Sequence, residues 1–359
     1  MAEKIPPVTI LLRYFTVGGL ERVVIDLANS YVKQGVDTQV VVMSTGKRNS
    51  LISELDPLVK VSLLSGSLRE KLTNLRNLTK DRIVHIHFGD GRIHPLIRTA
   101  LLGRTVVVTY HSVYSHKRNW FINRADQFWA SKASEIVAVS EAVKSFAVQD
   151  VHIPSGKVTV IRNGVEINAG QNEVKSDDAM ITLISLASLY PHKNHMVLFK
   201  AMSIARKKGL RVKLIVIGDG PSMADLYQYA IQEGINENIE WYGAVWKRSI
   251  VQSLLRDSDI FVSASNFEGM PISILEGMSY GLPMILSDIS SHRELADNSA
   301  LYFSPTNPEE MAELLVRLTS NKILYEQLKV YSLSRVHNFH LNNCVQDYLK
   351  VYQKAAGDA

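Results

Sequence analysis

The segment Ser263–Asp288 (SASNFEGMPISILEGMSYGLPMILSD) connects two short apolar runs through a helical stretch. The runs are Ile260–Ser263 and Met284–Ser287, and both have the nearly continuous apolar character of strands buried in a parallel sheet. Between them, Ile272–Tyr280 is expected to form a short helix. A strand, a helix and a second strand in this order are the repeating unit of an α/β fold with right-handed crossovers.

The same alternation occurs in two series along the 359 residues, a length that suits two domains. The first series of expected strands is Val8–Arg13, Thr38–Met43, Val59–Leu64, Ile83–Phe88, Thr105–Tyr110, Ile136–Ser140 and Val158–Ile161. The second series is Met180–Ala187, Val212–Ile217, Ile239–Tyr242, Ile260–Ser263, Met284–Ser287 and Leu301–Phe303. Further expected helices are Leu20–Gln34, Asn194–Lys208, Ser222–Gly234 and Ser249–Arg256. The pattern predicts two doubly wound, Rossmann-like parallel-sheet domains.

The domain boundaries follow from a polar stretch, Glu166–Asp178 (EINAGQNEVKSDD), which is the expected linker. We therefore expect an N-terminal domain over residues 1–166 and a C-terminal domain over residues 179–335. A last helix over residues 336–359 could pack back on the N-terminal domain. Two such domains would place the carboxyl ends of both sheets at a shared cleft, where α/β folds bind ligands.

Composition narrows the class of protein. Hydrophobic residues make up 46% of the chain, as in globular proteins, and a single cysteine, Cys344, excludes an internal disulfide and suits the cytoplasm. No signal peptide or membrane-spanning stretch is evident in the sequence. Residues 1–166 contain 22 Lys and Arg against 14 Asp and Glu, a net charge of +8, whereas the remainder carries −3. The basic half indicates a phospholipid surface, a phosphate-bearing acceptor or nucleic acid as partner, or else an ordinary solvated surface.

The absence of several motifs argues against other classes of protein. The sequence has no CxxC, HExxH or GxxxxGK[ST] pattern, and no GxGxxG opens either half, so zinc proteins, P-loop NTPases and dehydrogenases lose support. A DxD-like triplet, Asp257-Ser258-Asp259, precedes its strand rather than following it. Since ligands bind at the carboxyl ends of parallel strands, we expect no metal.

The chemistry is expected around Glu268 and Glu276, eight residues apart. Gly269 permits close approach of a ligand, and Pro271 suits the first turn of a helix. A helix start at Met270–Ser273 would present free amides to a phosphate or a sugar oxygen. Carboxylates near such a site accept hydrogen bonds from neutral hydroxyls, such as those of a ribose or a hexose. The pattern alone also fits two ordinary exposed glutamates.

The surrounding residues resemble the signature of glycosyltransferase family 4, retaining enzymes with the GT-B fold. The family pattern is Glu, seven residues, Glu, followed by a Gly-Pro turn, and here Gly281-Leu282-Pro283 follows Glu276. The resemblance implies that Glu268 contacts the transferred sugar and Glu276 the ribose. It also implies a donor-binding helix start formed by Gly269, Met270, Pro271 and Ile272.

Other family landmarks occur in the same order along the chain. Gly18-Gly19-Leu20-Glu21-Arg22-Val23 resembles the GG-x-E-R-V loop after the first strand, so Gly18 and Gly19 are expected to face donor phosphate or acceptor. Val160–Val165 (VIRNGV) resembles the family's VIPNGV turn. Gly218-Asp219-Gly220-Pro221 resembles its G-x-G-P turn, which implies a donor contact at Gly218.

The segment Leu186–Asn194 (LASLYPHKN) both matches the family and departs from it. Lys193 and Asn194 match the family's K-N, where the lysine offsets the charge of the diphosphate. The family's arginine position holds Ser188, which cannot supply a positive charge. We therefore expect leaving-group stabilisation to rest on Lys193, on helix N-termini or on a relocated basic residue, and a slow enzyme is conceivable.

Two features of the first half of the sequence have both a structural and a functional interpretation. His111 follows the strand Thr105–Tyr110, and a lone histidine there is often structural, but the resemblance implies that it touches donor sugar or acceptor. Tyr110–Trp129 (YHSVYSHKRNWFINRADQFW) mixes basic and aromatic residues, which suits a membrane interface or an ordinary amphipathic helix.

The resemblance implies a hexosyl- or N-acetylhexosaminyl-transferase of bacterial surface polysaccharide synthesis, with His111, Lys193 and Glu268 as catalytic residues. It would use a nucleotide-sugar donor, UDP-linked, with no cofactor or metal. The acceptor would be a glycan or a polyprenyl-diphosphate-linked sugar, not nucleic acid. We expect a cytoplasmic protein that could contact the anionic inner face of the plasma membrane. A nucleotide-sugar 2-epimerase and a non-catalytic nucleotide-sugar-binding protein remain alternatives.

Overall fold

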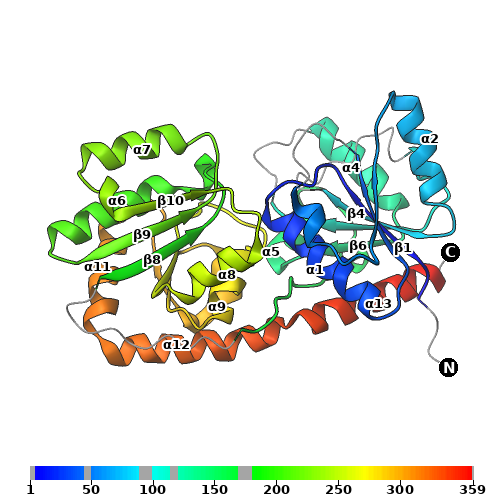
Figure 1. Cartoon of the computed structure of the whole chain (residues 1–359). Coiled ribbons are helices and arrows are strands. Elements are labelled where there is room, and N and C mark those ends of the chain that lie inside the picture. Colours follow the sequence, from blue (N-terminus) through cyan, green and yellow to red (C-terminus); the bar gives the residue numbers. More distant parts are fainter. Residues whose placement is uncertain (1–4, 44–49, 89–98, 114–119, 169–179, 358–359) are drawn as a thin grey trace. The chain divides into compact units, whose positions relative to one another are not determined.

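The computed structural model describes residues 5–43, 50–88, 99–113, 120–168 and 180–357. The chain forms two compact units, each an α/β domain (Figure 1). Unit 1 combines Met1–Gly164 with Leu341–Ala359, and unit 2 is Val165–His340. Most of the predicted linker Glu166–Asp178 lies outside the described residues.

In the described part of unit 1, seven strands form one parallel sheet in the order β3-β2-β1-β4-β5-β6-β7. The strands are β1 Val8–Leu12, β2 Thr38–Val42, β3 Lys60–Leu63, β4 Ile83–Phe88, β5 Val106–Tyr110, β6 Glu135–Ala138 and β7 Val158–Val160. Each lies where the apolar runs predict it, within two residues. Every residue of β1 and β2 is buried, because helices cover both faces of a parallel sheet.

The helices of unit 1 include one from the far end of the chain. They are α1 Gly19–Lys33, α2 Leu68–Leu78, α4 Trp120–Lys132, α5 Glu141–Gln149 and α13 Leu341–Gly357, with 3-10 turns η1 Ser50–Glu54 and η3 Ser155–Lys157. Ser140 caps α5 by accepting the N–H of Val143. Helix α13 (red in Figure 1) packs beside α1 and against β5, and it buries Val345, Tyr348, Leu349 and Tyr352.

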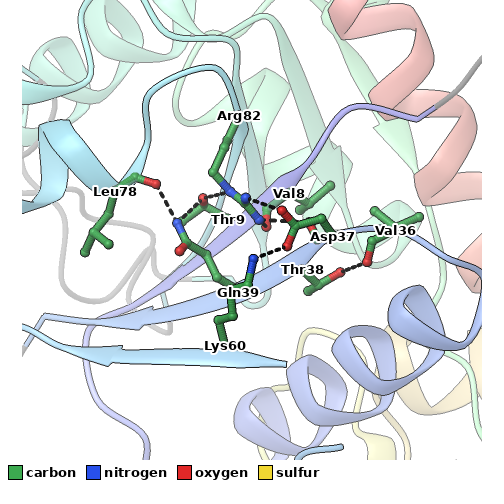
Figure 2. A network of polar contacts seen from close by, with 9 residues as sticks. All are labelled: Val8, Thr9, Val36, Asp37, Thr38, Gln39, Lys60, Leu78 and Arg82. Carbon is green, nitrogen blue, oxygen red and sulfur yellow. Dashed lines mark hydrogen bonds and ion pairs between the residues drawn. The ribbon is translucent and has the colours of Figure 1, made fainter. Parts of the chain in front are cut away.

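A polar network ties the amino ends of the central strands of unit 1 (Figure 2). Arg82, directly before β4, donates to Val8 O at 2.9 Å, to Thr9 Oγ1 at 3.0 Å and to the Asp37 carboxylate at 2.8 Å. The hydrogen bond from Arg82 holds the pKa of Asp37 below its ordinary value. The network lies at the edge opposite to the strand carboxyl ends, so its role is to join β1, β2 and β4.

In the described part of unit 2, six strands form a second parallel sheet in the order β10-β9-β8-β11-β12-β13. They are β8 Ile181–Leu186, β9 Val212–Ile217, β10 Ile239–Gly243, β11 Ile260–Ser263, β12 Met284–Ser287 and β13 Ala300–Phe303. These positions confirm the second predicted series. The order reverses between β8 and β11, which is the switch point where doubly wound folds bind ligands.

The helices of unit 2 cover its sheet and continue into a helical C-terminal part. They are α6 His195–Lys207, α7 Met223–Gln232, α8 Arg248–Arg256, α9 Ile272–Ser279, α10 Ser290–Ala296, α11 Pro308–Ser320 and α12 Lys322–Val336. The 3-10 turns are η4 Pro191–Lys193, η5 Asn236–Asn238, η6 Asp297–Ser299 and η7 His337–Phe339. Buried Phe199 of α6 packs among residues of β8, β9 and α11 in the core. None of the helices within the described residues is both long enough and apolar enough to span a bilayer.

Gly277 of α9 gives a test of the packing between this helix and the sheet. An added Cβ would lie 2.8 Å from the Phe261 ring and 3.0 Å from Met284. Alanine raises helix propensity by about 1 kcal/mol over glycine, but overpacking a tight contact costs about 1–3 kcal/mol. Gly277→Ala should therefore lower the midpoint of denaturant unfolding.

The matched control is Gly357→Ala at the end of α13, where nothing lies within 4 Å of an added Cβ. This variant should leave the midpoint unchanged or slightly raised. An unchanged or raised midpoint in Gly277→Ala would contradict the close packing of α9 on β11 and β12.

Candidate functional site

The loops that follow β8 and β11 are tied to each other at the switch point of unit 2. The backbone N–H of Asn266 donates to His192 O at 2.8 Å, and the rings of His192 and Phe267 stack with centroids 4.9 Å apart. The residues next in sequence to this stacked pair are Lys193 and Glu268. The two loops therefore bring these predicted site residues together, although they are 75 positions apart.

Lys193 and Glu268 form a largely buried ion pair, Nζ to Oε1, with 17% and 11% of their side chains exposed. Ser265 donates to the same carboxylate at 2.8 Å. Burial raises the pKa of Glu268, but the ammonium of Lys193 and its hydrogen bond lower that pKa by more, so it lies below its ordinary value. Glu268 is therefore a stable carboxylate that can accept hydrogen bonds.

Two buried histidines that the sequence reasoning did not assign to the site interact electrostatically with this pair. Both His195 and His292 feel the charges of Lys193 and Glu268, and burial lowers the pKa of each histidine to about 4. His292 Nδ1 lies 2.9 Å from Ser287 O, an atom that can only accept, so the proton of this neutral ring is on Nδ1.

The second ring nitrogens, His292 Nε2 and His195 Nδ1, are buried and have no hydrogen-bond partner among the described residues. A buried polar atom without a partner is costly, and a bound hydroxyl or water would satisfy it. Only the fold reveals this feature, because the sequence pattern around His292 gives no indication of a ligand site.

Asn194 and Gly218 have roles in shaping the backbone of this edge. Asn194 adopts the left-handed conformation (φ 56°) before α6, and its amide donates to Pro305 O at 2.8 Å. Gly218 has φ 153°, and a Cβ there would lie 1.9 Å from Ala187 O. Glycine is thus required where the end of β9 meets the loop after β8. Ser188 in that loop is exposed, and its hydroxyl replaces the arginine of the family pattern.

Helix α9 begins at Ile272, with Pro271 as its N-cap, so Pro271 precedes the first turn rather than lying in it. Gly269, Met270 and Ile272 are all buried. Glu276, on the same helix, lies 3.9 Å from Arg248 Nη1 at the start of α8.

Glu276 and Arg248 both line a small pocket of unit 2, together with Asn168 and Tyr280. Arg248 is a second basic residue near the predicted signature segment, and the sequence reasoning did not identify it. Glu276 therefore lies beside Arg248, whereas Glu268 is paired with Lys193.

In unit 1, the predicted glycines lie at the start of α1. Gly18 is the N-cap, with extended backbone (φ −171°), and Gly19 is the first helical residue. Gly18 has no side chain to cap the helix, and both glycines are exposed, so the first amides of α1 are candidates for holding an anionic group. An added Cβ at Gly18 would lie 2.6 Å from Glu21 Oε2, the mobile end of a side chain, so glycine is not demanded by the backbone.

His111 directly follows β5, and its Nε2 lies 2.9 Å from Nδ1 of His87 on β4. Burial lowers the pKa of His111 to about 3, so the ring is neutral at physiological pH. It therefore hydrogen-bonds as a neutral donor and acceptor rather than as a cation.

The Asp257-Ser258-Asp259 triplet has a structural role at the amino end of β11. Asp259 is buried, and its carboxylate accepts the backbone N–H of Thr182 at 2.7 Å. The described residues contain no group of three or more His, Cys, Asp and Glu side chains arranged to hold a metal ion.

The sequence matches two family models that together cover most of the chain. Residues 17–169 match the model described as Glycosyltransferase Family 4. Residues 167–335 match the model described as Glycosyl transferases group 1.

Curated relatives carry similar names. The chain is 26% identical over 304 residues to the UDP-Gal:alpha-D-GlcNAc-diphosphoundecaprenol alpha-1,3-galactosyltransferase of Escherichia coli, covering 78% of this chain and 77% of the relative. It is 23% identical over 375 residues to the GDP-mannose:cellobiosyl-diphosphopolyprenol alpha-mannosyltransferase of Komagataeibacter xylinus, covering 96% and 91%.

Solved structures share the fold over almost the whole length. HepE of Anabaena, solved in complex with UDP-glucose, has a TM-score of 0.83 at 18% identity, covering 97% of this chain and 99% of HepE. A glycosyltransferase of Rickettsia africae has a TM-score of 0.79 at 19% identity, covering 98% and 99%. The two parallel sheets are those of the GT-B fold, and the chain belongs to the glycosyltransferases of family 4, group 1.

Proposed function

We propose that this glycosyltransferase moves a hexose or N-acetylhexosamine from a UDP-linked donor, with retention of anomeric configuration, onto a polyprenyl-diphosphate-linked sugar or a growing glycan of a surface polysaccharide. The observation that carries the proposal is the buried Lys193–Glu268 pair at the carboxyl edge of the unit 2 sheet. HepE was solved with UDP-glucose, and the E. coli relative is named for a UDP-linked donor and a polyprenyl-diphosphate acceptor.

The pair suits a nucleotide-diphosphate sugar because the two residues offer opposite chemistry side by side. The Lys193 ammonium can hold a diphosphate oxygen, and the ionised Glu268 can accept hydrogen bonds from sugar hydroxyls. The unpaired His292 Nε2 can accept another hydroxyl. Glu276 would take the ribose hydroxyls, exchanging its contact with Arg248 for them.

The proposed reaction is a front-face displacement without a protein nucleophile. The bond between the anomeric carbon and the diphosphate oxygen breaks, and the acceptor oxygen bonds to that carbon on the same face. The acceptor proton passes to the departing diphosphate oxygen. Lys193 and the N-terminal amides of α9 stabilise the charge on that leaving group, so positioning and electrostatics supply the catalysis. His111 is proposed to act at the reaction centre, and no metal is required in this scheme.

The acceptor class is supported by one face of α4 in the basic unit 1. Trp120, Arg124, Phe128 and Lys132 follow one another at intervals of four, so they share one side of the helix. Trp120 and Phe128 are 63% and 56% exposed, so neither ring is packed into the core. Arg124 and Lys132 lie over these rings, 5.7 and 5.9 Å from the centroids. Alternating aromatic and basic side chains suit the surface of an anionic membrane. Lys117 and Arg118 lie outside the described residues.

The donor can be identified by thermal shift across UDP-, GDP-, ADP- and TDP-sugars, because a ligand at 100 times its Kd stabilises by about 2.7 kcal/mol. We expect a UDP-sugar to give the largest shift. Glu276→Ala should weaken its binding about ten- to hundredfold, since two charge-assisted hydrogen bonds are lost. Glu233→Ala, which removes a carboxylate paired with Lys207 elsewhere in unit 2, is the control and should bind normally.

Lys193→Ala should lower kcat about 10²–10³-fold with a much smaller change in donor Kd, because the ammonium acts mainly on the charge of the leaving group. Turnover is measured as release of nucleotide diphosphate and transfer of sugar to a lipid-linked acceptor. Lys213→Ala, which removes a lysine paired with Glu240, is the matched control.

The remaining outcomes separate the other functions. An epimer formed from UDP-GlcNAc alone would identify a nucleotide-sugar 2-epimerase. Donor binding without turnover over the whole acceptor panel would identify a binding protein, with Ser188 as the explanation.

The α4 face predicts salt-sensitive binding to vesicles that contain anionic phospholipid. Arg124→Glu with Lys132→Glu should abolish co-sedimentation with such vesicles, and Phe128→Ala should weaken it. Lys329→Glu with Lys350→Glu, the same charge change on unit 2 and on α13, should have little effect. Equal loss of vesicle binding in both double variants would show that binding depends on the net charge of the protein and not on the α4 face.

A further inference from the structure

A chain of three histidines connects the candidate residue His111 with the C-terminal helix of unit 1. His85 and His87 are alternate residues of β4, so their side chains lie on the same face of the sheet. The neighbouring strand β5 places Thr109 opposite His87, and Thr109 precedes His111 by two residues. Helix α13 covers this face with Tyr348 and Tyr352, one helical turn apart.

The rings are joined by hydrogen bonds that form a continuous path. His111 Nε2 lies 2.9 Å from His87 Nδ1, and His87 Nε2 lies 3.0 Å from His85 Nδ1. His85 Nδ1 also lies 2.6 Å from the Tyr352 hydroxyl, and His85 Nε2 lies 2.7 Å from Thr109 Oγ1. Tyr31 of α1 contacts the Tyr352 hydroxyl at 3.1 Å. His85, His87 and Tyr352 are fully buried.

All three rings are neutral, because burial lowers the pKa of His85 and His87 well below the ordinary value and that of His111 to about 3. A neutral imidazole has one N–H and one acceptor nitrogen. Each hydrogen bond between two rings needs an N–H on one ring and an unprotonated nitrogen on the other. The position of the proton on one histidine therefore determines the position of the proton on the other two. The chain has two states. His111 carries its proton on Nδ1 in one state and on Nε2 in the other.

The contact of His85 with Tyr352 of α13, at one end of the histidine chain, selects between these states. An N–H···O hydrogen bond normally spans about 2.7–3.2 Å, whereas an O–H donor approaches more closely. The 2.6 Å contact therefore fits the Tyr352 hydroxyl as donor and His85 Nδ1 as acceptor. His85 then donates from Nε2 to Thr109, His87 donates from Nε2 toward His85, and His111 donates from Nε2 to His87.

We propose that His85 and His87, held by Tyr352, are positioning residues that keep His111 in its Nε2–H tautomer, so that His111 Nδ1 offers a lone pair to a substrate hydroxyl. The consequence for catalysis rests on the proposed function, in which His111 lies at the reaction centre. The assignment of the tautomer does not depend on that function. Helix α13, from the end of the chain, thus determines the hydrogen-bonding character of a residue after β5.

The test is nitrogen NMR of the full chain labelled with ¹⁵N-histidine, since protonated and unprotonated ring nitrogens have well-separated shifts. His111→Gln identifies the signals of His111 among the 11 histidines. In the wild type, Nε2 should be protonated and Nδ1 not. Tyr352→Phe removes the donor and should shift His111 toward the Nδ1–H form. Tyr348→Phe, which loses a hydroxyl of the same helix that contacts Thr109 and not His85, should leave His111 unchanged.

A rescue makes the assignment sharper. His87→Asp places a carboxylate, which can only accept, near the position of Nδ1, so it accepts from His111 whatever the state of Tyr352. Adding this change to Tyr352→Phe should return a proton to His111 Nε2. An Nδ1–H form in the wild type, or no shift in Tyr352→Phe, would overturn the proposal even if the enzyme behaves as proposed.

Kinetics then separate this inference from the function. In Tyr352→Phe, kcat should fall in proportion to the fraction of His111 that changes tautomer, with donor Kd unchanged. A shifted tautomer with normal kcat would remove His111 from the reaction centre while supporting the histidine chain as the element that orients it.

Discussion

Parallel strands all end at the same edge of their sheet, and the candidate residues of this protein depend on that constraint. Lys193 lies in the loop after β8, Gly218 directly after β9, and Glu268 in the loop after β11. Each strand buries an apolar run whose hydrogen bonds are satisfied only by its neighbours, so the sheet cannot form without gathering these loops. The chemistry of unit 2 is thus a consequence of how its core is hydrogen-bonded.

The gathered side chains do not simply stand ready for a ligand; they satisfy one another first. Lys193 and Glu268 neutralise each other where an isolated charge would be costly. Glu276 likewise lies near Arg248. A nucleotide-sugar that supplies both negative phosphate and neutral hydroxyls can replace such contacts without leaving a buried charge alone.

The histidine chain of unit 1 uses a different principle, because its buried rings are neutral. His85, His87 and His111 share hydrogen bonds in place of charges, and burial keeps them unprotonated. A buried polar network of this kind is favourable only when every member has a partner, so it fixes geometry closely. Tyr352 closes this network from α13, so a helix from the end of the polypeptide contributes to the polar interior of unit 1.

The amino-acid sequence by itself determined the two sheets, since apolar runs such as Val8–Arg13 and Met180–Ala187 alternate with helical stretches in the order typical of buried parallel strands. It also singled out Lys193, Glu268 and Glu276 through spacing that resembles a family signature. It did not reveal His195, His292 or Arg248 beside these residues, or the chain from His111 to Tyr352. Those partners are separated by up to hundreds of positions, and their pairing depends on which strand ends and helix faces meet. Only the tertiary structure decides that, because burial, unpaired ring nitrogens and tautomers are properties of contacts between distant segments rather than of local pattern.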